Sequence, residues 1–123
     1  MEINNLTHDI LKCAYTVHTA LGPGLLESAY KECLYYELVS SNFRVEKEKS
    51  MPLIYKEVKM EVGYRIDLLV ENKVIIELKS VENISDVYIA QLLTYMKLAD
   101  CKIGLLINFN VKSLKDGIKR YIL

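Results

Sequence analysis

The sequence lacks an excess of charge of either sign. Its 123 residues contain 16 lysines and arginines and 16 aspartates and glutamates, so the formal net charge is zero. A protein that holds nucleic acid through bulk charge alone would carry a large positive excess. A disordered charged tail would be poor in apolar residues, whereas 51% of this chain is apolar. The composition therefore predicts a folded domain that does not bind nucleic acid through net charge alone.

Long apolar segments are also missing. The strongest candidate, Ile103–Ile107, is far shorter than the roughly 18 residues that a membrane-spanning helix requires. The first residues have neither the basic start nor the apolar stretch of a signal peptide. We therefore expect a soluble cytoplasmic protein with no membrane partner.

Cysteine and histidine are too scarce for a disulfide framework or a zinc site. The three cysteines, Cys13, Cys33 and Cys101, lie far apart and form no C-x-x-C pair. We expect them to be reduced. The two histidines are too few to build a His-rich zinc site with them. Any metal ion in this protein would be held by carboxylates.

The spacing of apolar residues predicts a single domain over residues 1–123, with no repeats and no linker. Helical spacing runs from Leu6 to Leu21 and stops at Gly22-Pro23-Gly24. A second helical pattern starts at Leu25 and ends near Asn42. The further expected elements are an irregular strand over 43–54, a helix from Ser85 to about Ala99, a buried strand over 101–109 and a short strand over 118–122.

The clearest pattern lies between residues 57 and 79. Apolar residues occupy seven successive even positions from Val58 to Val70, which predicts one long strand with a bend near Gly63. Glu71–Lys73 is typical of a tight turn, and residues 74–79 would return as a second strand. The expected fold class is α/β, with a mixed central sheet flanked by helices.

This hairpin would bring two carboxylates together. A three-residue turn makes Val70 face Val74, and Asp67 would then face Glu77. Opposed residues have Cβ atoms roughly 4.5–5.5 Å apart, a distance at which two carboxylates repel. A divalent cation between them would compensate, and oxygen ligands favour Mg²⁺ or Mn²⁺. Lys79 points the same way as Glu77, so its ammonium would lie near the same ion.

A second interpretation needs no metal. Arg65 and Lys79 could neutralise Asp67 and Glu77 in cross-strand pairs on a solvent-facing sheet. The spacing Asp-x9-Glu-x-Lys has only three fixed positions, so both interpretations stay open.

Two further features bear on a site. Glu27 begins the second helix, where with Gly24 as N-cap it would be the N3 residue of a capping arrangement. In the third helix Tyr88, Gln91 and Tyr95 form one stripe beside an apolar stripe that should meet the sheet. Gln91 is unusual there because an amide among apolar neighbours needs hydrogen-bond partners.

These residues resemble the bacterial and archaeal GxxExxY protein family, whose signature corresponds to Gly24-x-x-Glu27-x-x-Tyr30. The match spans nearly the whole chain in the right order. It continues through Val17-His18-x-x-Leu21-Gly22-Pro23-Gly24-Leu25-Leu26-Glu27, Tyr64-Arg65-x-Asp67-Leu68-Leu69-Val70, Val74-Ile75-x-Glu77-Leu78-Lys79, Ala90-Gln91-Leu92-Leu93-x-Tyr95, Gly104-Leu105-Leu106-Ile107-Asn108-Phe109 and Lys119-Arg120. Ser80 and Asn110 stand where the resemblance implies alanine and glycine.

The family is grouped with the PD-(D/E)XK nuclease superfamily, so the resemblance implies a restriction-endonuclease-like domain with an αβββαβ core. It also implies the site residues. Asp67, Glu77 and the carbonyl of Leu78 would be metal ligands, Lys79 the catalytic lysine, and Glu27 the helical acidic residue, catalytic and metal-binding. Gln91 and Tyr95 are similar to the motif of the RecB-like branch and would position the site or contact the substrate.

The function so implied is metal-dependent hydrolysis of phosphodiester bonds in nucleic acid, with DNA as the expected substrate and Mg²⁺ or Mn²⁺ as cofactor. Small nucleases of this architecture often pair, so a homodimer is compatible with it. His18, just before the Gly22–Gly24 turn, would either approach substrate or support the turn. Two alternatives remain: a non-catalytic nucleic-acid-binding or assembly module on the same fold, and hydrolysis of a small phosphorylated ligand.

Overall fold

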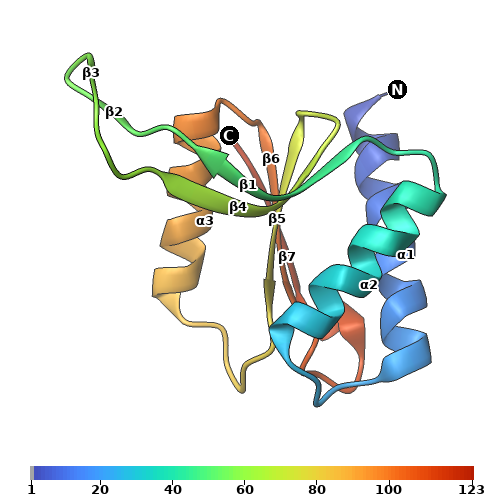
Figure 1. Ribbon diagram of the computed structural model, residues 1–123. Helices are drawn as coiled ribbons and strands as arrows, with labels where there is room; N and C mark the ends of the chain where they lie inside the picture. The colour runs from blue at the N-terminus through green and yellow to red at the C-terminus, as the bar shows by residue number, and fades with distance from the viewer. Residues whose placement is uncertain (1) are drawn as a thin grey trace.

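The computed structural model describes residues 2–123, in which three α-helices flank a five-stranded sheet (Figure 1). The helices are α1 (Ile3–Leu21), α2 (Glu27–Ser40) and α3 (Asp86–Ala99), and a 3₁₀-helix spans Leu114–Gly117. Helices α1 and α2 cover one face of the sheet, and α3 covers the other (Figure 1). The described residues contain no helix that is both long and apolar enough to span a bilayer.

The sheet is mixed, with the strand order β1-β4-β5-β6-β7. Its strands are β1 (Val45–Met51), β4 (Tyr64–Val70), β5 (Val74–Lys79), β6 (Ile103–Asn108) and β7 (Ile118–Ile122). Strands β5 and β6 are parallel and are joined through α3, while the other neighbours are antiparallel. From α2 onward, the sheet and its helices follow the predicted αβββαβ order with β7 added, so the expected α/β fold class is confirmed.

The central strands β4, β5 and β6 are mostly buried and pack against helices on both faces of the sheet. The α1/α2 side contains residues such as Leu68, Val70 and Ile76, and the α3 side contains Leu69, Ile75 and others. Strand β6 is buried along its whole length. The second face is therefore not the solvent-facing surface that the paired-charge interpretation assumed.

The long alternating strand is wrong in its first half. Val58 and Lys59 form β3, which pairs with β2 (Ile54–Tyr55) in a small hairpin that projects from the sheet (Figure 1). Val58 and Val62 are 56% and 74% exposed, so their alternation does not face a core. The chain breaks at Gly63, where a Cβ would collide with a backbone oxygen of β1. The predicted bend is a separation into two strands.

The predicted hairpin register is confirmed, but one residue faces the wrong side. Residues 71–73 form the turn, and Val70 pairs with Val74 and Leu68 with Ile76. Ile66, which should share the face of Leu68, is instead buried in the cluster on the α3 side. The ladder between β4 and β5 stops at Leu68, and without further cross-strand bonds the start of β4 can twist away.

The start of the second helix also differs from the prediction. Leu26, rather than Gly24, is the N-cap, so Glu27 is the first helical residue and not N3. Leu25 and Leu26, at the start of the predicted helical pattern, precede the helix and are 42% and 78% exposed. The reason is backbone geometry: Gly24 has φ 104°, a conformation that only glycine adopts readily and that does not lead directly into a helix.

Candidate active site

The candidate site lies where strands β4 and β5 stop pairing. Beyond Leu68 and Ile76 the carboxylates take over the role of the ladder: Glu77 Oε2 accepts the Asp67 N–H at 2.8 Å, and Asp67 Oδ2 accepts the Leu78 N–H at 3.0 Å. These reciprocal bonds hold both side chains against the backbone of the opposite strand. The sequence-predicted meeting of Asp67 and Glu77 is confirmed.

Glu77 is the most perturbed acid of the site. Its residue is only 4% exposed, between buried neighbours of β5 and β6. Burial is the main cause that raises its pKa to about 8, and the negative charge of Asp67 raises it further, against the hydrogen bond from the Asp67 N–H. A buried carboxylate beside a second carboxylate is unfavourable unless a cation or a proton neutralises it.

Lys79 and Tyr95 lie near this pair, and each has a tyrosine ring against it. The Lys79 Nζ lies 4.4 Å from the ring centroid of Tyr88, within cation–π range. Tyr95 packs on Tyr64, with ring centroids 4.9 Å apart. Burial first, and then the charges of Glu77 and Asp67, raise the pKa of Tyr95, which places its hydroxyl within the field of both carboxylates. Of the predicted tyrosine stripe, Tyr88 and Tyr95 therefore border the site.

Glu27 enters from α2, and the Gly-rich loop before the helix sets its position. The Tyr30 hydroxyl donates to the Gly22 carbonyl and accepts the Leu25 N–H at 3.1 Å, while its ring stacks on Phe109 at 4.6 Å. This explains the spacing Gly-x-x-Glu-x-x-Tyr, because the tyrosine ties down the loop that places the glutamate. Burial, and then the charge of Asp67, raise the pKa of Glu27.

The segment after Lys79 is held by side chains whose role the sequence did not indicate. Ser80 Oγ donates to the Leu25 carbonyl at 2.6 Å and so ties the end of β5 to the glycine loop. Asn108 is 3% exposed; its amide oxygen accepts the Val81 N–H and its amide nitrogen donates to the Val81 carbonyl. The backbone around Lys79 is therefore fixed from two sides. The one sequence feature that could have indicated this role is Asn108, a polar residue at the end of an otherwise apolar strand.

Cross-strand neutralisation of the carboxylates is not observed. Within residues 2–123, neither Arg65 nor Lys79 forms an ion pair within 4 Å of Asp67 or Glu77. The nearby cation is Lys31 of α2, whose Nζ lies 3.8 Å from Asp67 Oδ1. That lysine was not among the predicted site residues, because a lysine in a helix normally looks like a surface charge.

Of two further predicted residues, Gln91 lies on the surface and His18 lies away from the carboxylates. Gln91 is exposed on α3, so it does not need the buried hydrogen-bond partners that its apolar neighbours suggested. His18 is 8% exposed, and its Nε2 lies 2.8 Å from the Val111 carbonyl. The His18 backbone carbonyl also accepts the Gly22 N–H, so this residue connects the glycine turn to the loop after β6.

Comparison with known families decides the relationship of this fold and site. The sequence model described as the PD-(D/E)XK nuclease superfamily matches residues 4–121. The chain belongs to the PD-(D/E)XK nuclease superfamily. The mixed sheet with α2 and α3 on opposite faces is accordingly a restriction-endonuclease-like fold. Members of this superfamily are usually nucleases, and they typically use divalent metal ions.

A solved structure shares the PD-(D/E)XK fold of this chain. It carries the description "Crystal structure of SSO0001" and aligns with a TM-score of 0.54 at 24% sequence identity. The alignment covers 77% of this chain and 48% of that chain, so the present chain spans about half of that protein. At this identity the likeness concerns the fold alone. No curated protein sequence matches the chain.

The donor set can be tested against the divalent ion that the superfamily implies. In the part of the chain that the structure describes, no three His, Cys, Asp or Glu side chains form a group that could hold a metal ion. Asp67 and Glu77 each accept a backbone N–H with one carboxylate oxygen, which leaves the other oxygen to bind a metal ion. Together with a backbone carbonyl, two carboxylates fit a hard ion that keeps several waters. The raised pKa of Glu77 shows that a cation there would relieve an existing conflict.

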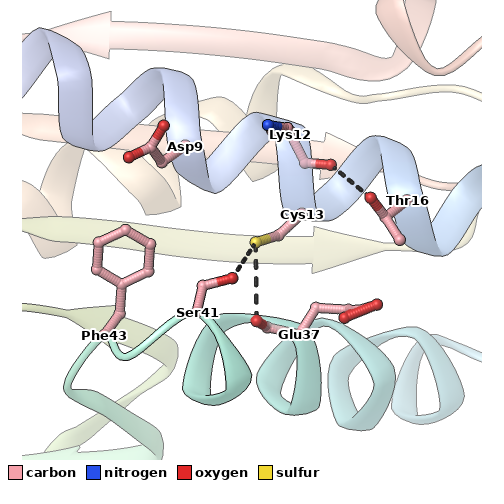
Figure 2. A pocket seen from close by; sticks show the side chains of 7 residues that line it. All are labelled: Asp9, Lys12, Cys13, Thr16, Glu37, Ser41 and Phe43. Carbon is pink, nitrogen blue, oxygen red and sulfur yellow. Dashed lines mark hydrogen bonds between the residues drawn. The ribbon is translucent and has the colours of Figure 1, made fainter.

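A separate hollow of about 310 Å³ lies between α1 and α2 and shares no residue with this candidate site (Figure 2). Its central thiol, Cys13, is within hydrogen-bond distance of the Glu37 carbonyl at 3.8 Å and of Ser41 Oγ at 3.5 Å. The thiol thus links α1 to the end of α2.

Proposed function

We propose that this chain is a metal-dependent nuclease that hydrolyses phosphodiester bonds in nucleic acid, with DNA as its substrate and Mg²⁺ or Mn²⁺ as its cofactor. One observation carries the proposal: Asp67 and Glu77 are held side by side by backbone N–H groups, and the buried Glu77 has no cationic partner among the described residues. Such a pair is unfavourable for stability and is suited to binding a cation.

The residues divide the chemistry between them. Asp67, Glu77 and the Leu78 carbonyl would hold the ion, and Glu27 of α2, which does not group with the two carboxylates in the described residues, would have to move closer to contribute. When bound, a divalent ion supplies Lewis acidity toward a phosphate oxygen and toward the attacking water. The Lys79 ammonium would donate a hydrogen bond to that water or to a phosphate oxygen and so stabilise the charge that develops during hydrolysis. Tyr88 would hold Lys79 in place through its ring.

Further residues would serve the substrate. Tyr95 and Gln91 would contact the nucleic acid or position the site, as expected for the RecB-like branch and the GxxExxY family. His18 would act as a positioning residue through the glycine turn. The C-terminal part, residues 81–123, carries six basic and four acidic residues and would face phosphates better than the N-terminal part. Pairing of two chains would allow both strands of a duplex to be cut.

A substrate panel tests this function. End-labelled single-stranded and double-stranded DNA and RNA, together with closed circular DNA, would be incubated with the protein and Mg²⁺ or Mn²⁺. We expect metal-dependent cleavage of at least one DNA form, and no cleavage when a chelator removes the metal. Asp67→Asn should lower the cleavage rate by about 100-fold or more, because it weakens the ion site.

The matched control is Glu71→Gln, since Glu71 lies on the turn after β4 and its carboxylate bonds only to the Arg44 N–H among the described residues. This variant should cleave at the wild-type rate. If no nucleic acid form is cleaved with either metal, or if Asp67→Asn cleaves as the wild type does, the proposed function is wrong and a non-catalytic binding module becomes the better description.

A further inference from the structure

A lysine that the superfamily motif does not contain lies buried against the proposed ion site. Lys31 follows Glu27 by one turn of α2, and its residue is only 7% exposed. Its Nζ lies 3.0 Å from Glu48 Oε1 and 3.8 Å from Asp67 Oδ1. A buried ammonium group is unfavourable unless it is paired, so these two carboxylates determine where the Lys31 charge sits.

Glu48 reaches Lys31 from a strained position in the middle of β1. Its φ is 51°, which is unusual for a residue other than glycine. In the register it stands opposite Asp67, between the pairs Lys47↔Leu68 and Lys49↔Ile66, and it does not itself pair in the ladder. Strain of this kind persists where the surroundings enforce it, and it often marks a functional position. Here it brings the Glu48 carboxylate to the lysine beside a proposed metal ligand.

The charges of this region can be counted. It contains the carboxylates Glu27, Glu48, Asp67 and Glu77 and the ammonium groups Lys31 and Lys79. With every group ionised, four negative and two positive charges leave an excess equal to that of one divalent ion. Arg65, a further cation in the same strand as Asp67, is exposed and therefore strongly screened by water.

We propose that Lys31, held by Glu48, is a positioning residue that supplies a fixed positive charge to Asp67 and stands in for a second metal ion, so that this site takes one divalent ion. The proposal rests on the proposed function, because it assumes that Asp67 and Glu77 hold the ion. Lys31 acts through Asp67: at 3.8 Å from Oδ1 its charge leaves that oxygen able to bind an ion, and it lowers the negative potential that would attract a second ion.

Two substitutions should change metal affinity in opposite directions. Lys31→Met removes a positive charge next to Asp67, so Mn²⁺ should bind about tenfold more tightly and a second Mn²⁺ should bind. Glu48→Gln removes a negative charge and leaves Lys31 with Asp67 as its charged partner, so Mn²⁺ should bind about threefold more weakly. If Lys31 and Glu48 served only packing, both substitutions would weaken binding.

The experiment is a Mn²⁺ titration of the metal-free protein by calorimetry, with free Mn²⁺ measured by electron paramagnetic resonance. We expect one ion for the wild type, and we expect Lys31→Arg, which keeps the charge, to behave as the wild type. The control is Lys47→Met. Lys47 joins β1 to α2 through an ion pair with Glu32 at 2.8 Å, outside the site, so its loss should leave the Mn²⁺ affinity unchanged.

Two ions in the wild type, or Lys31→Met with unchanged or weaker affinity, would overturn the proposal. If Lys31→Met does not fold, Lys31→Gln takes its place: tighter Mn²⁺ binding supports the proposal, and unchanged or weaker binding overturns it. Cleavage of DNA, measured in parallel, separates this proposal from the proposed function. One bound ion without cleavage would contradict only the nuclease, two ions with cleavage would contradict only the role of Lys31, and no bound ion would contradict both.

Discussion

The buried Glu77 carboxylate should make the metal-free protein less stable as the pH rises. Burial and the neighbouring Asp67 raise the pKa of Glu77 from an ordinary 4.5 to about 8, so the folded protein binds a proton that the unfolded chain releases. The neutral acid is therefore the favoured native form. Glutamine at position 77 mimics that neutral acid. Glu77→Gln should therefore be more stable than the wild type at every pH at which the unfolded wild-type chain releases this proton.

The sign and size follow from linkage. A raised pKa contributes stability that is fully present below the unfolded value of 4.5 and is lost as the pH rises through the folded value of about 8. The loss over that interval is on the order of 4 kcal/mol. Glu77→Gln has no group to ionise at this position. The difference between its free energy of unfolding and that of the wild type should therefore grow by a similar amount between mildly acidic and mildly basic pH.

The assay is urea unfolding followed by circular dichroism from about pH 5 to about pH 9, in the presence of a chelator. The free energy of unfolding of Glu77→Gln should exceed that of the wild type by an amount that grows with pH. Added Mn²⁺ should stabilise the wild type and should not stabilise Glu77→Gln, because only the wild type keeps both carboxylates. Glu61→Gln, at an exposed position between β3 and β4, is the control and should show no pH-dependent difference.

A constant difference between Glu77→Gln and the wild type at all pH values would refute the reasoning. It would mean that Glu77 ionises as easily in the folded protein as in the unfolded chain. A variant that is less stable than the wild type throughout would also refute it, because the main role of the carboxylate would then be to accept the Asp67 N–H.

Three substitutions test the residues that support the site, each by urea unfolding. Tyr30→Phe removes the hydroxyl that holds the loop 22–25, so it should cost about 1–2 kcal/mol and reduce cleavage through Glu27. Asn108→Ala removes both hydrogen bonds to Val81 and should cost about 2–3 kcal/mol; a loss below 0.5 kcal/mol would show that water replaces them. Gly104→Val places a side chain against two buried residues of α3 and should cost about 1–3 kcal/mol, whereas an unchanged midpoint would show that α3 can shift.

Local patterns in the sequence predicted the elements that local forces determine. The helix after residue 85 and the turn at Glu71–Lys73 appear as expected, because caps, turn residues and apolar spacing act within a few residues. The turn length determined the register, and the register brought Asp67 to Glu77. This part of the candidate site therefore required only counting along a hairpin.

The predictions are wrong where contacts between distant segments of the chain determine the structure. Alternation over 57–70 is a real pattern, yet Val58 and Val62 meet no other layer, and β1 packs so closely at Gly63 that the strand breaks there. Nothing in the local sequence indicates which part of an alternating segment will lack a layer packed against it. The same holds for Ile66, whose side depends on where the ladder to β5 ends.

Electrostatic partners were equally hidden from the sequence. Lys31 and Glu48 are 17 positions apart and look like ordinary charges on a helix and on an edge strand. The packing of α2 against the sheet brings Lys31 to Asp67, and the pairing of β1 with β4 places Glu48 opposite it. Tyr30 had a visible place in the motif, but its role in holding the glycine loop depends on two backbone partners that precede its own helix.

The most direct test of the proposed nuclease compares the single-turnover cleavage rate of the wild type with that of Lys79→Met in saturating Mn²⁺, with Mn²⁺ affinity measured on both proteins. Lys79 lies beside the carboxylates and over Tyr88 but is not a proposed metal ligand, so the variant should still bind the ion. We expect cleavage to fall by about 100-fold or more while Mn²⁺ binding persists. Equal cleavage rates in the two proteins, or no cleavage by the wild type, would contradict a hydrolytic site built on Asp67, Glu77 and Lys79.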